Sequence, residues 1–80
     1  MSLTTLERAF VTALRVSPAC HFESLARGKT AEWDSVAHME LVLELENAFG
    51  VTLSEDDVFE LKDFPTAREI LGRHGVSPSA

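Results

Sequence analysis

Apolar side chains recur every three or four residues in four stretches of the chain, and this spacing predicts four helices. The first stretch carries Leu3, Leu6, Phe10, Ala13 and Leu14. We expect this helix to begin at a threonine cap, either Thr4 or Thr5. It should end near Val16, because Pro18 disfavours helical backbone at the residue before it.

The second stretch predicts the longest helix, from about Ser35 to Phe49. Asp34 or Ser35 supplies its amino-terminal cap, and Gly50 is the left-handed residue expected to end it. The long connection before it, residues 17–33, holds few apolar residues, so a few anchors should attach it to the core. The anchors that we expect are Phe22 and Leu25.

Two shorter helices follow an extended link. Ser54 opens a capping-box pattern with an acidic residue, Asp57, at its third position. Thr66 opens a second such pattern directly after Pro65. The apolar positions of these two helices are Val58, Leu61, Ala67, Ile70 and Leu71. No segment has the pattern of a paired strand, so we expect an all-α bundle of three main helices and one short helix.

The long second helix has two apolar faces when its residues are placed at about 100° intervals. One face should pack in the core and consists of Leu41, Val42, Leu45, Ala48 and Phe49. The opposite face consists of Val36, Met39 and Leu43, with Glu40, Glu44 and Glu46 on its flanks. Single exposed apolar residues are common on proteins. A contiguous apolar stripe with carboxylates around it is more typical of a protein-binding surface, which is the interpretation that we favour.

The charge of the chain is concentrated in the same region. The 80 residues carry a net charge of −6, but nine acidic residues and one lysine between Asp34 and Asp63 give that segment −8. The segments on either side are each +1. Two interpretations of this charge are open. The acidic residues form either a surface that is simply solvated or a docking face for a basic partner. The acidic excess argues against binding to nucleic acid or to anionic membranes.

Length and composition predict one small domain, residues 1–76, with a flexible tail at 77–80. No apolar run approaches the roughly 20 residues of a membrane span, so we expect no membrane insertion. The single cysteine, Cys20, excludes an internal disulfide. Together with the lack of a signal segment, this predicts a cytoplasmic protein.

Ser35 stands where the long connection meets the second helix, a place where a serine is ordinarily only a helix cap. Its context is more specific. Asp34-Ser35-Val36 is followed by an acidic amphipathic helix that ends in Phe49, a short link, and the acidic run Ser54-Glu55-Asp56-Asp57. From Trp33 to Leu71 this pattern resembles the acyl carrier protein family, whose fold is likewise a small helical bundle.

The resemblance implies a covalent attachment site. In the family, the matching serine receives 4′-phosphopantetheine from coenzyme A through a separate transferase, and the thiol of this arm carries acyl groups as thioesters. Ser35 is then the attachment residue and Asp34 the motif acid beside it. A phosphodiester at a helix amino terminus is physically reasonable, because that end of the helix favours an anion.

The resemblance also implies partners. They are a phosphopantetheinyl transferase and acyl-loading, condensing or modifying enzymes with basic docking surfaces, in fatty-acid, polyketide or related biosynthesis. The carrier is expected to be a monomer. Trp33-Asp34-Ser35 resembles free-standing carriers of specialised pathways, and Thr30-Ala31-Glu32-Trp33 and Val36 depart from the usual family residues. The partner-binding residues that we expect are Val36, Met39, Glu40, Leu43, Glu44, Glu46, Asp56 and Asp57.

Two alternatives stay open. One is a non-enzymatic interaction module with a carrier-like fold that is never phosphopantetheinylated. The other is a small hydrolase that uses Ser35 with His38 as its base, although no positioned acid accompanies them. We otherwise expect no catalytic residues, because the adjacent Cys20 and His21 are poorly placed to act as a pair. We expect no metal site either, since the histidines lack ligand spacing.

Overall fold

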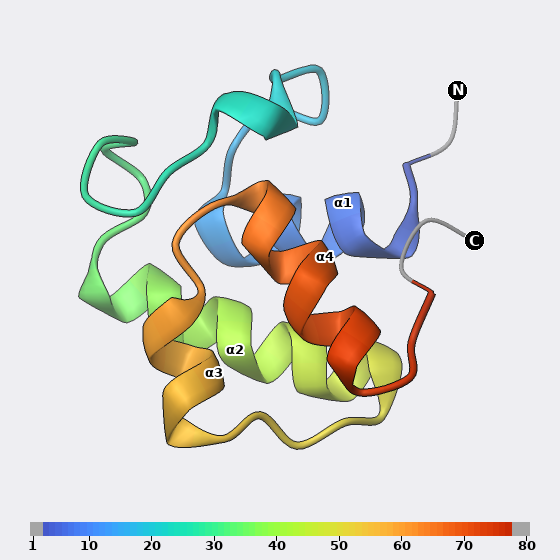
Figure 1. The fold of residues 1–80 in the computed structure, drawn as a ribbon. Coiled ribbons are helices and arrows are strands. Elements are labelled where there is room, and N and C mark those ends of the chain that lie inside the picture. The colour runs from blue at the N-terminus through green and yellow to red at the C-terminus, as the bar shows by residue number, and fades with distance from the viewer. Residues whose placement is uncertain (1–2, 78–80) are drawn as a thin grey trace.

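The computed structural model describes residues 3–77 and confirms the all-α prediction: four α-helices and one short 3₁₀-helix are present in this part of the chain, without a strand. The helices are α1 (Thr5–Leu14), η1 (Phe22–Ser24), α2 (Ser35–Phe49), α3 (Glu55–Glu60) and α4 (Phe64–Arg73), as Figure 1 shows. No helix within 3–77 is long and apolar enough to cross a membrane. Apart from Ser77, the predicted tail lies outside the described residues.

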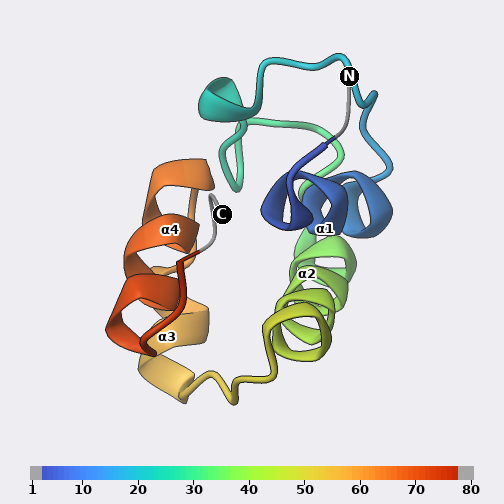
Figure 2. The same cartoon turned by 90° about the vertical axis from the view of Figure 1, so that its right-hand side faces the viewer.

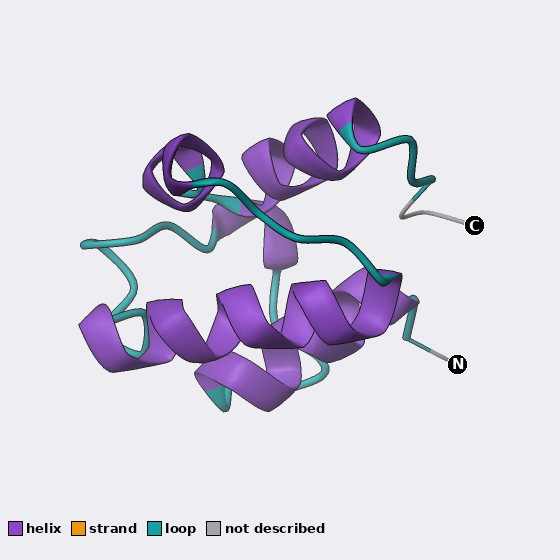
Figure 3. Cartoon of the chain, turned by 90° about the horizontal axis from the view of Figure 1, so that it is seen from below, coloured by secondary structure: helices purple, strands orange, loops and turns teal. Residues whose placement is uncertain are grey.

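The helices form two facing pairs. Figure 2 shows α1 beside α2 on one side of the molecule, and α3 beside α4 on the other. The view from below in Figure 3 shows α2 running along one side of the bundle, with loops joining it to the opposite pair. Buried side chains fill the space between the pairs, so the core is shared by all four α-helices.

Aromatic rings from three elements meet at the centre of this core. The ring of Phe10 in α1 makes edge contacts with Trp33 and Phe64, with ring centroids 5.5 Å and 4.9 Å apart. Trp33 is the last residue of the connection before Asp34, and its side chain is 1% exposed. Such edge-to-face pairs add to the free energy gained by burying the rings. Trp33 therefore fixes the end of the connection directly beside the start of α2.

The long connection is attached to the rest of the fold at the two predicted anchors. Phe22 and Leu25 are buried in the same core, which confirms the expectation. Farther along, the backbone N–H of Arg27 donates to the carbonyl of Lys62 at 2.8 Å. Because these contacts join the connection to the α3–α4 side, the segment before α2 is held against both halves of the bundle.

The ends of α1 and α2 follow their local sequence signals. Thr4 caps α1 in a capping box with Glu7, and Asp34 caps α2. Gly50 ends α2 in the left-handed conformation at φ 66°, as predicted. The prediction that α1 continues to about Val16 is wrong by two residues, because Arg15 already adopts left-handed backbone and closes the helix.

The start of α4 differs from the prediction. Thr66 is the third helical residue rather than the cap, and the cap is Asp63. Asp63 Oδ1 accepts the Thr66 N–H at 2.9 Å, while Thr66 Oγ1 accepts the Asp63 N–H at 3.0 Å. Pro65 is tolerated inside the helix because its missing N–H belongs to the first turn, where no intrahelical partner exists.

The core face of α2 is shifted toward its amino terminus relative to the prediction. Ala48 is exposed, so it was wrongly assigned to the core, whereas Phe49 is half-buried and packs against the core. Ala37 and His38 are buried instead. The amino-terminal half of α2 lies against Trp33 and α3. His38 is buried there because its ring is hydrogen-bonded to the Trp33 indole and to the carbonyl of Val58.

Candidate functional site

Ser35 is the first residue of α2, and its side chain is exposed. The capping role belongs to its neighbour, because Asp34 Oδ1 accepts the N–H of Ala37 at 2.9 Å. The Ser35 hydroxyl is therefore not needed to cap the helix. This separation of roles leaves an exposed nucleophilic oxygen at a rigid, well-defined position.

The amino terminus of α2 suits an attached anion. The first N–H groups of any α-helix lack partners within the helix, and their aligned dipoles favour negative charge. Asp34 accepts a hydrogen bond from the N–H of Ala37. A phosphate attached to Ser35 would lie at the same positive end of the helix. A phosphate joined to Ser35 Oγ therefore fits the residues present at this position.

A groove runs from Ser35 between α2 and α3. The part next to the serine has a volume of about 550 Å³, within the range of small-molecule sites. Its lining residues are Arg27, Gly28, Trp33, Asp34, Ser35, His38, Met39 and Phe59. A more apolar part continues along the two helices and adds Leu53, Glu55 and Val58 to Arg27, His38, Met39 and Phe59. We call these residues together the α2–α3 groove.

The floor of the α2–α3 groove is a hydrogen-bonded histidine. Trp33 Nε1–H donates to His38 Nδ1 at 2.9 Å, so Nδ1 is an acceptor. The proton of neutral His38 must then be on Nε2, which lies 2.9 Å from the carbonyl oxygen of Val58 and donates to it. The ring also stacks on the Trp33 indole. His38 is only 7% exposed, so its ring is buried at this position.

Arg27 completes this contact between the connection, α2 and α3. Its Nη2 donates to the carbonyl of Phe59 at 3.0 Å, while its Nη1 lies 3.0 Å from His38 Nε2. Since Nε2 carries the histidine proton, the latter approach brings two donors together and is not a hydrogen bond. The last carbonyls of a helix lack intrahelical partners, and here His38 and Arg27 serve two of those in α3.

The same surroundings lower the pKa of His38. Burial is the main cause because it disfavours the charged ring, and the neighbouring Arg27 acts in the same direction, although the bond to Val58 opposes them. Both ring nitrogens already have partners, Trp33 and Val58. His38 is thus a structural residue of the groove, and the hydrolase hypothesis loses the base that it required for Ser35.

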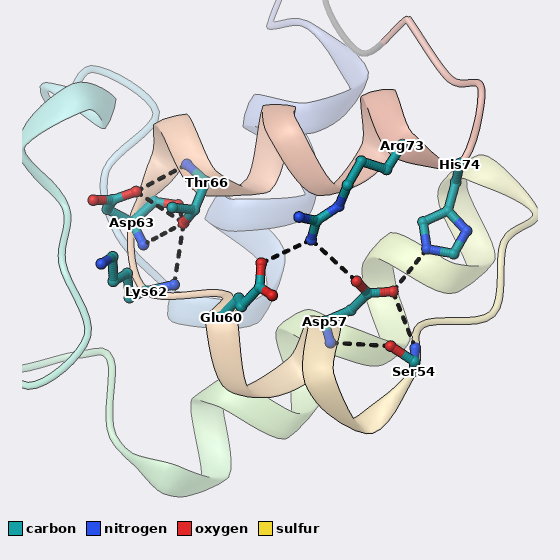
Figure 4. A network of polar contacts seen from close by, with 8 residues as sticks. All are labelled: Ser54, Asp57, Glu60, Lys62, Asp63, Thr66, Arg73 and His74. Carbon is teal, nitrogen blue, oxygen red and sulfur yellow. Dashed lines mark hydrogen bonds and ion pairs between the residues drawn. The ribbon is translucent and has the colours of Figure 1, made fainter.

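Asp57 anchors the other end of α3. It forms a capping box with Ser54, and its two oxygens also receive Arg73 at 3.2 Å and His74 at 2.8 Å (Figure 4). The hydrogen bond from His74 is the main reason why the pKa of Asp57 lies below its ordinary value. Asp57 is 8% exposed, so its carboxylate is used inside the fold and does not offer the free docking charge that we expected.

The other expected partner-binding residues are placed differently. Val36, Met39 and Leu43 are 69%, 52% and 57% exposed along α2, as a contiguous binding stripe requires. Glu46 is half-buried and accepts the N–H of Leu53 at 2.9 Å, so it also supports the link to α3. Of the remaining acids, Glu40 and Glu44 are half-buried on α2 and Asp56 is exposed on α3. Their binding role stays a prediction.

One surface residue was missed. Phe59 in α3 is 78% exposed and lines the α2–α3 groove opposite Met39. The signal was available in the sequence: once Val58 and Leu61 are assigned to the inner side of this helix, the 100° step places residue 59 outside. Within residues 3–77, no cluster of three or more histidine, cysteine or acidic side chains is arranged to hold a metal ion.

A family model described as "Phosphopantetheine attachment site" matches residues 32–73, which is more than half of the chain. The matched segment contains Asp34 and Ser35 and extends through α2 and α3 to the end of α4. No curated protein and no solved structure matches the chain significantly.

Proposed function

The chain belongs to the phosphopantetheine attachment site family, and we propose that it is an acyl carrier protein whose arm is attached to Ser35. Members of this family carry 4′-phosphopantetheine as a prosthetic group. The observation that carries the proposal is the exposed Ser35 hydroxyl at the start of α2, inside the matched segment, with capping left to Asp34. When bound, the arm would supply a thiol that holds acyl groups as thioesters.

Attachment requires an external enzyme. Ser35 Oγ would form a bond to the phosphorus of coenzyme A that joins the arm, and the phosphoanhydride bond would break to release adenosine 3′,5′-bisphosphate. The hydroxyl proton would pass to a base of the phosphopantetheinyl transferase, because His38 is buried and engaged by Trp33 and Val58. The chain's own part is to expose Ser35 and to offer a helix terminus that favours the resulting phosphodiester.

The surface around Ser35 supports a docking role. Val36, Met39 and Leu43 form the exposed apolar stripe, and Glu40 and Glu44 flank it. We propose that acyl-loading, condensing or modifying enzymes bind here through basic surfaces, in fatty-acid, polyketide or related biosynthesis in the cytoplasm. A monomeric carrier that performs no bond chemistry itself needs contacts that form and separate quickly, and electrostatic steering provides them.

A mass-shift experiment tests the proposal. The apo protein is incubated with coenzyme A, Mg²⁺ and a broad-specificity phosphopantetheinyl transferase, and intact mass is measured. We expect one added arm, located at Ser35 by fragmentation, and no addition to Ser35→Ala. Ser24→Ala, which changes another exposed serine, is the matched control and should be modified normally. Unchanged wild-type mass with several such transferases would contradict the proposal and favour an interaction module without an arm.

A further inference from the structure

Phe59 is an unusual surface residue for this small acidic protein. At 78% exposure it is more exposed than Val36, Met39 or Leu43, the other large hydrophobic side chains that are exposed within residues 3–77. Exposed aromatic area is unfavourable in water, and burying it in a partner recovers that free energy. Since isolated exposed hydrophobics are common, exposure alone assigns no role to Phe59.

The backbone that carries Phe59 is held by side chains from outside its helix. Arg27 Nη2 donates to the Phe59 carbonyl at 3.0 Å, and His38 Nε2 donates to the preceding carbonyl, that of Val58, at 2.9 Å. A six-residue helix such as α3 is too short to be stable by itself, so these contacts, together with those of Asp57 at its other end, determine where it lies. Phe59 is therefore presented at a fixed place, which reduces the entropy lost on binding.

The position of Phe59 links it to Ser35. Both residues line the α2–α3 groove, with Met39 between them on the α2 side. Because both residues line this groove, an enzyme whose active site reaches Ser35 Oγ approaches the exposed Phe59 ring as well. Aromatic residues and methionine are enriched at the centres of protein interfaces, where they fill pockets of the partner.

An acidic side chain lies beside this apolar pair, because Glu55 lines the α2–α3 groove together with Met39 and Phe59. Glu55 and the adjacent Asp56 are both exposed at the start of α3. We propose that Phe59 is an aromatic anchor for the phosphopantetheinyl transferase. It inserts into an apolar pocket of that enzyme, and lysine or arginine residues on the pocket rim face these carboxylates. The inference depends on the proposed function, because it requires Ser35 to be the residue that is modified.

Steady-state kinetics of arm transfer test the anchor. The carrier concentration is varied with wild type, Phe59→Ala and Phe59→Leu, at saturating coenzyme A and with one broad-specificity transferase. An anchor contributes to binding throughout the reaction, so its loss should raise KM about tenfold in Phe59→Ala and leave kcat unchanged. Phe59→Leu should lie between wild type and Phe59→Ala. Thr5→Ala, an exposed position at the distant start of α1, is the control and should match wild type.

The outcomes separate this inference from the proposed function. Absence of any arm on the wild-type protein contradicts the proposed function itself. Normal modification of the wild type with an unchanged KM in Phe59→Ala overturns only the anchor. A lower kcat with unchanged KM also overturns it, because Phe59 would then act on the chemical step rather than on docking. Circular dichroism verifies that each variant keeps its helices, and Phe59→Gln replaces Phe59→Ala in the same assay if the alanine variant does not.

Discussion

The indole N–H of Trp33 donates to Nδ1 of His38 at 2.9 Å, and this bond fixes the histidine as a neutral ring that donates from Nε2 to the carbonyl of Val58. The contact joins three parts of the fold: the end of the long connection, the first turn of α2, and α3. It forms the floor of the groove beside Ser35. Protonation of His38 should therefore weaken the contacts that hold α3 against α2.

Acidification should destabilise the fold through His38. Its folded-state pKa lies below the ordinary value, mainly because of burial, so the unfolded chain binds the proton more readily. The stability contributed by neutral His38 is fully present above the unfolded pKa of about 6.5 and is lost as pH falls through the folded pKa. Urea unfolding at pH 7.5 and at pH 5 should show a smaller free energy of unfolding at pH 5.

Two variants identify the source of that pH effect. His38→Gln keeps one donor and one acceptor in the ring's place without a titratable group, so its unfolding free energy should change less between the two pH values. Trp33→Phe removes the N–H that faces Nδ1, so the pKa of His38 should rise toward its ordinary value in an NMR titration. An equal pH dependence in wild type and His38→Gln would show that His38 is not the source of the effect.

Asp57 and Asp56 are adjacent acids with different expected effects on stability. Asp57 caps α3 with Ser54 and receives Arg73 and His74, whereas Asp56 is exposed. Asp57→Ala should lower the free energy of unfolding by about 1–3 kcal/mol, because it removes a cap and leaves partners unpaired. Asp56→Ala should change it by less than about 0.5 kcal/mol. Similar losses in both variants would mean that the Asp57 network contributes little.

Gly50 and Gly72 offer a matched pair for backbone strain. Gly50 ends α2 at φ 66°, while Gly72 lies inside α4 with no atom within 4 Å of an added Cβ. Gly50→Ala should cost about 1 kcal/mol in thermal or urea unfolding, because alanine is strained in left-handed backbone. Gly72→Ala should stabilise the protein by roughly 0.5–1 kcal/mol. A neutral Gly50→Ala would show that the end of α2 relaxes without strain.

If the proposed docking face on α2 acts through its charge, reversing one of its acidic residues should slow arm transfer. Glu44→Lys reverses one charge beside the exposed stripe of α2 and should lower kcat/KM with the transferase several-fold at low salt. The difference should shrink near 0.5 M salt, because exposed charges are then screened over a few ångströms. Glu69→Lys, an exposed reversal on α4, is the control. Equal rates for Glu44→Lys and wild type at low salt would contradict steering through this face.

Local sequence determined the helices and the place of the candidate site. The caps Thr4, Asp34 and Ser54 and the terminator Gly50 act through bonds within a few residues, so each was recognisable without the fold. Ser35 was singled out for the same reason, since its signal is the run of residues around it. The exposed stripe of α2 also followed from helical spacing alone.

Tertiary contacts decided what the remaining residues do. His38 became a buried ring because Trp33 and Val58, from two other elements, occupy its nitrogens. Asp57 became an internal partner because Arg73 and His74, sixteen and seventeen positions later, reach its oxygens. Periodicity assigns a residue to a side of its own helix, but it does not say which distant groups meet that side. The groove beside Ser35, with Phe59 on its wall, therefore emerges only when α3 is placed against α2.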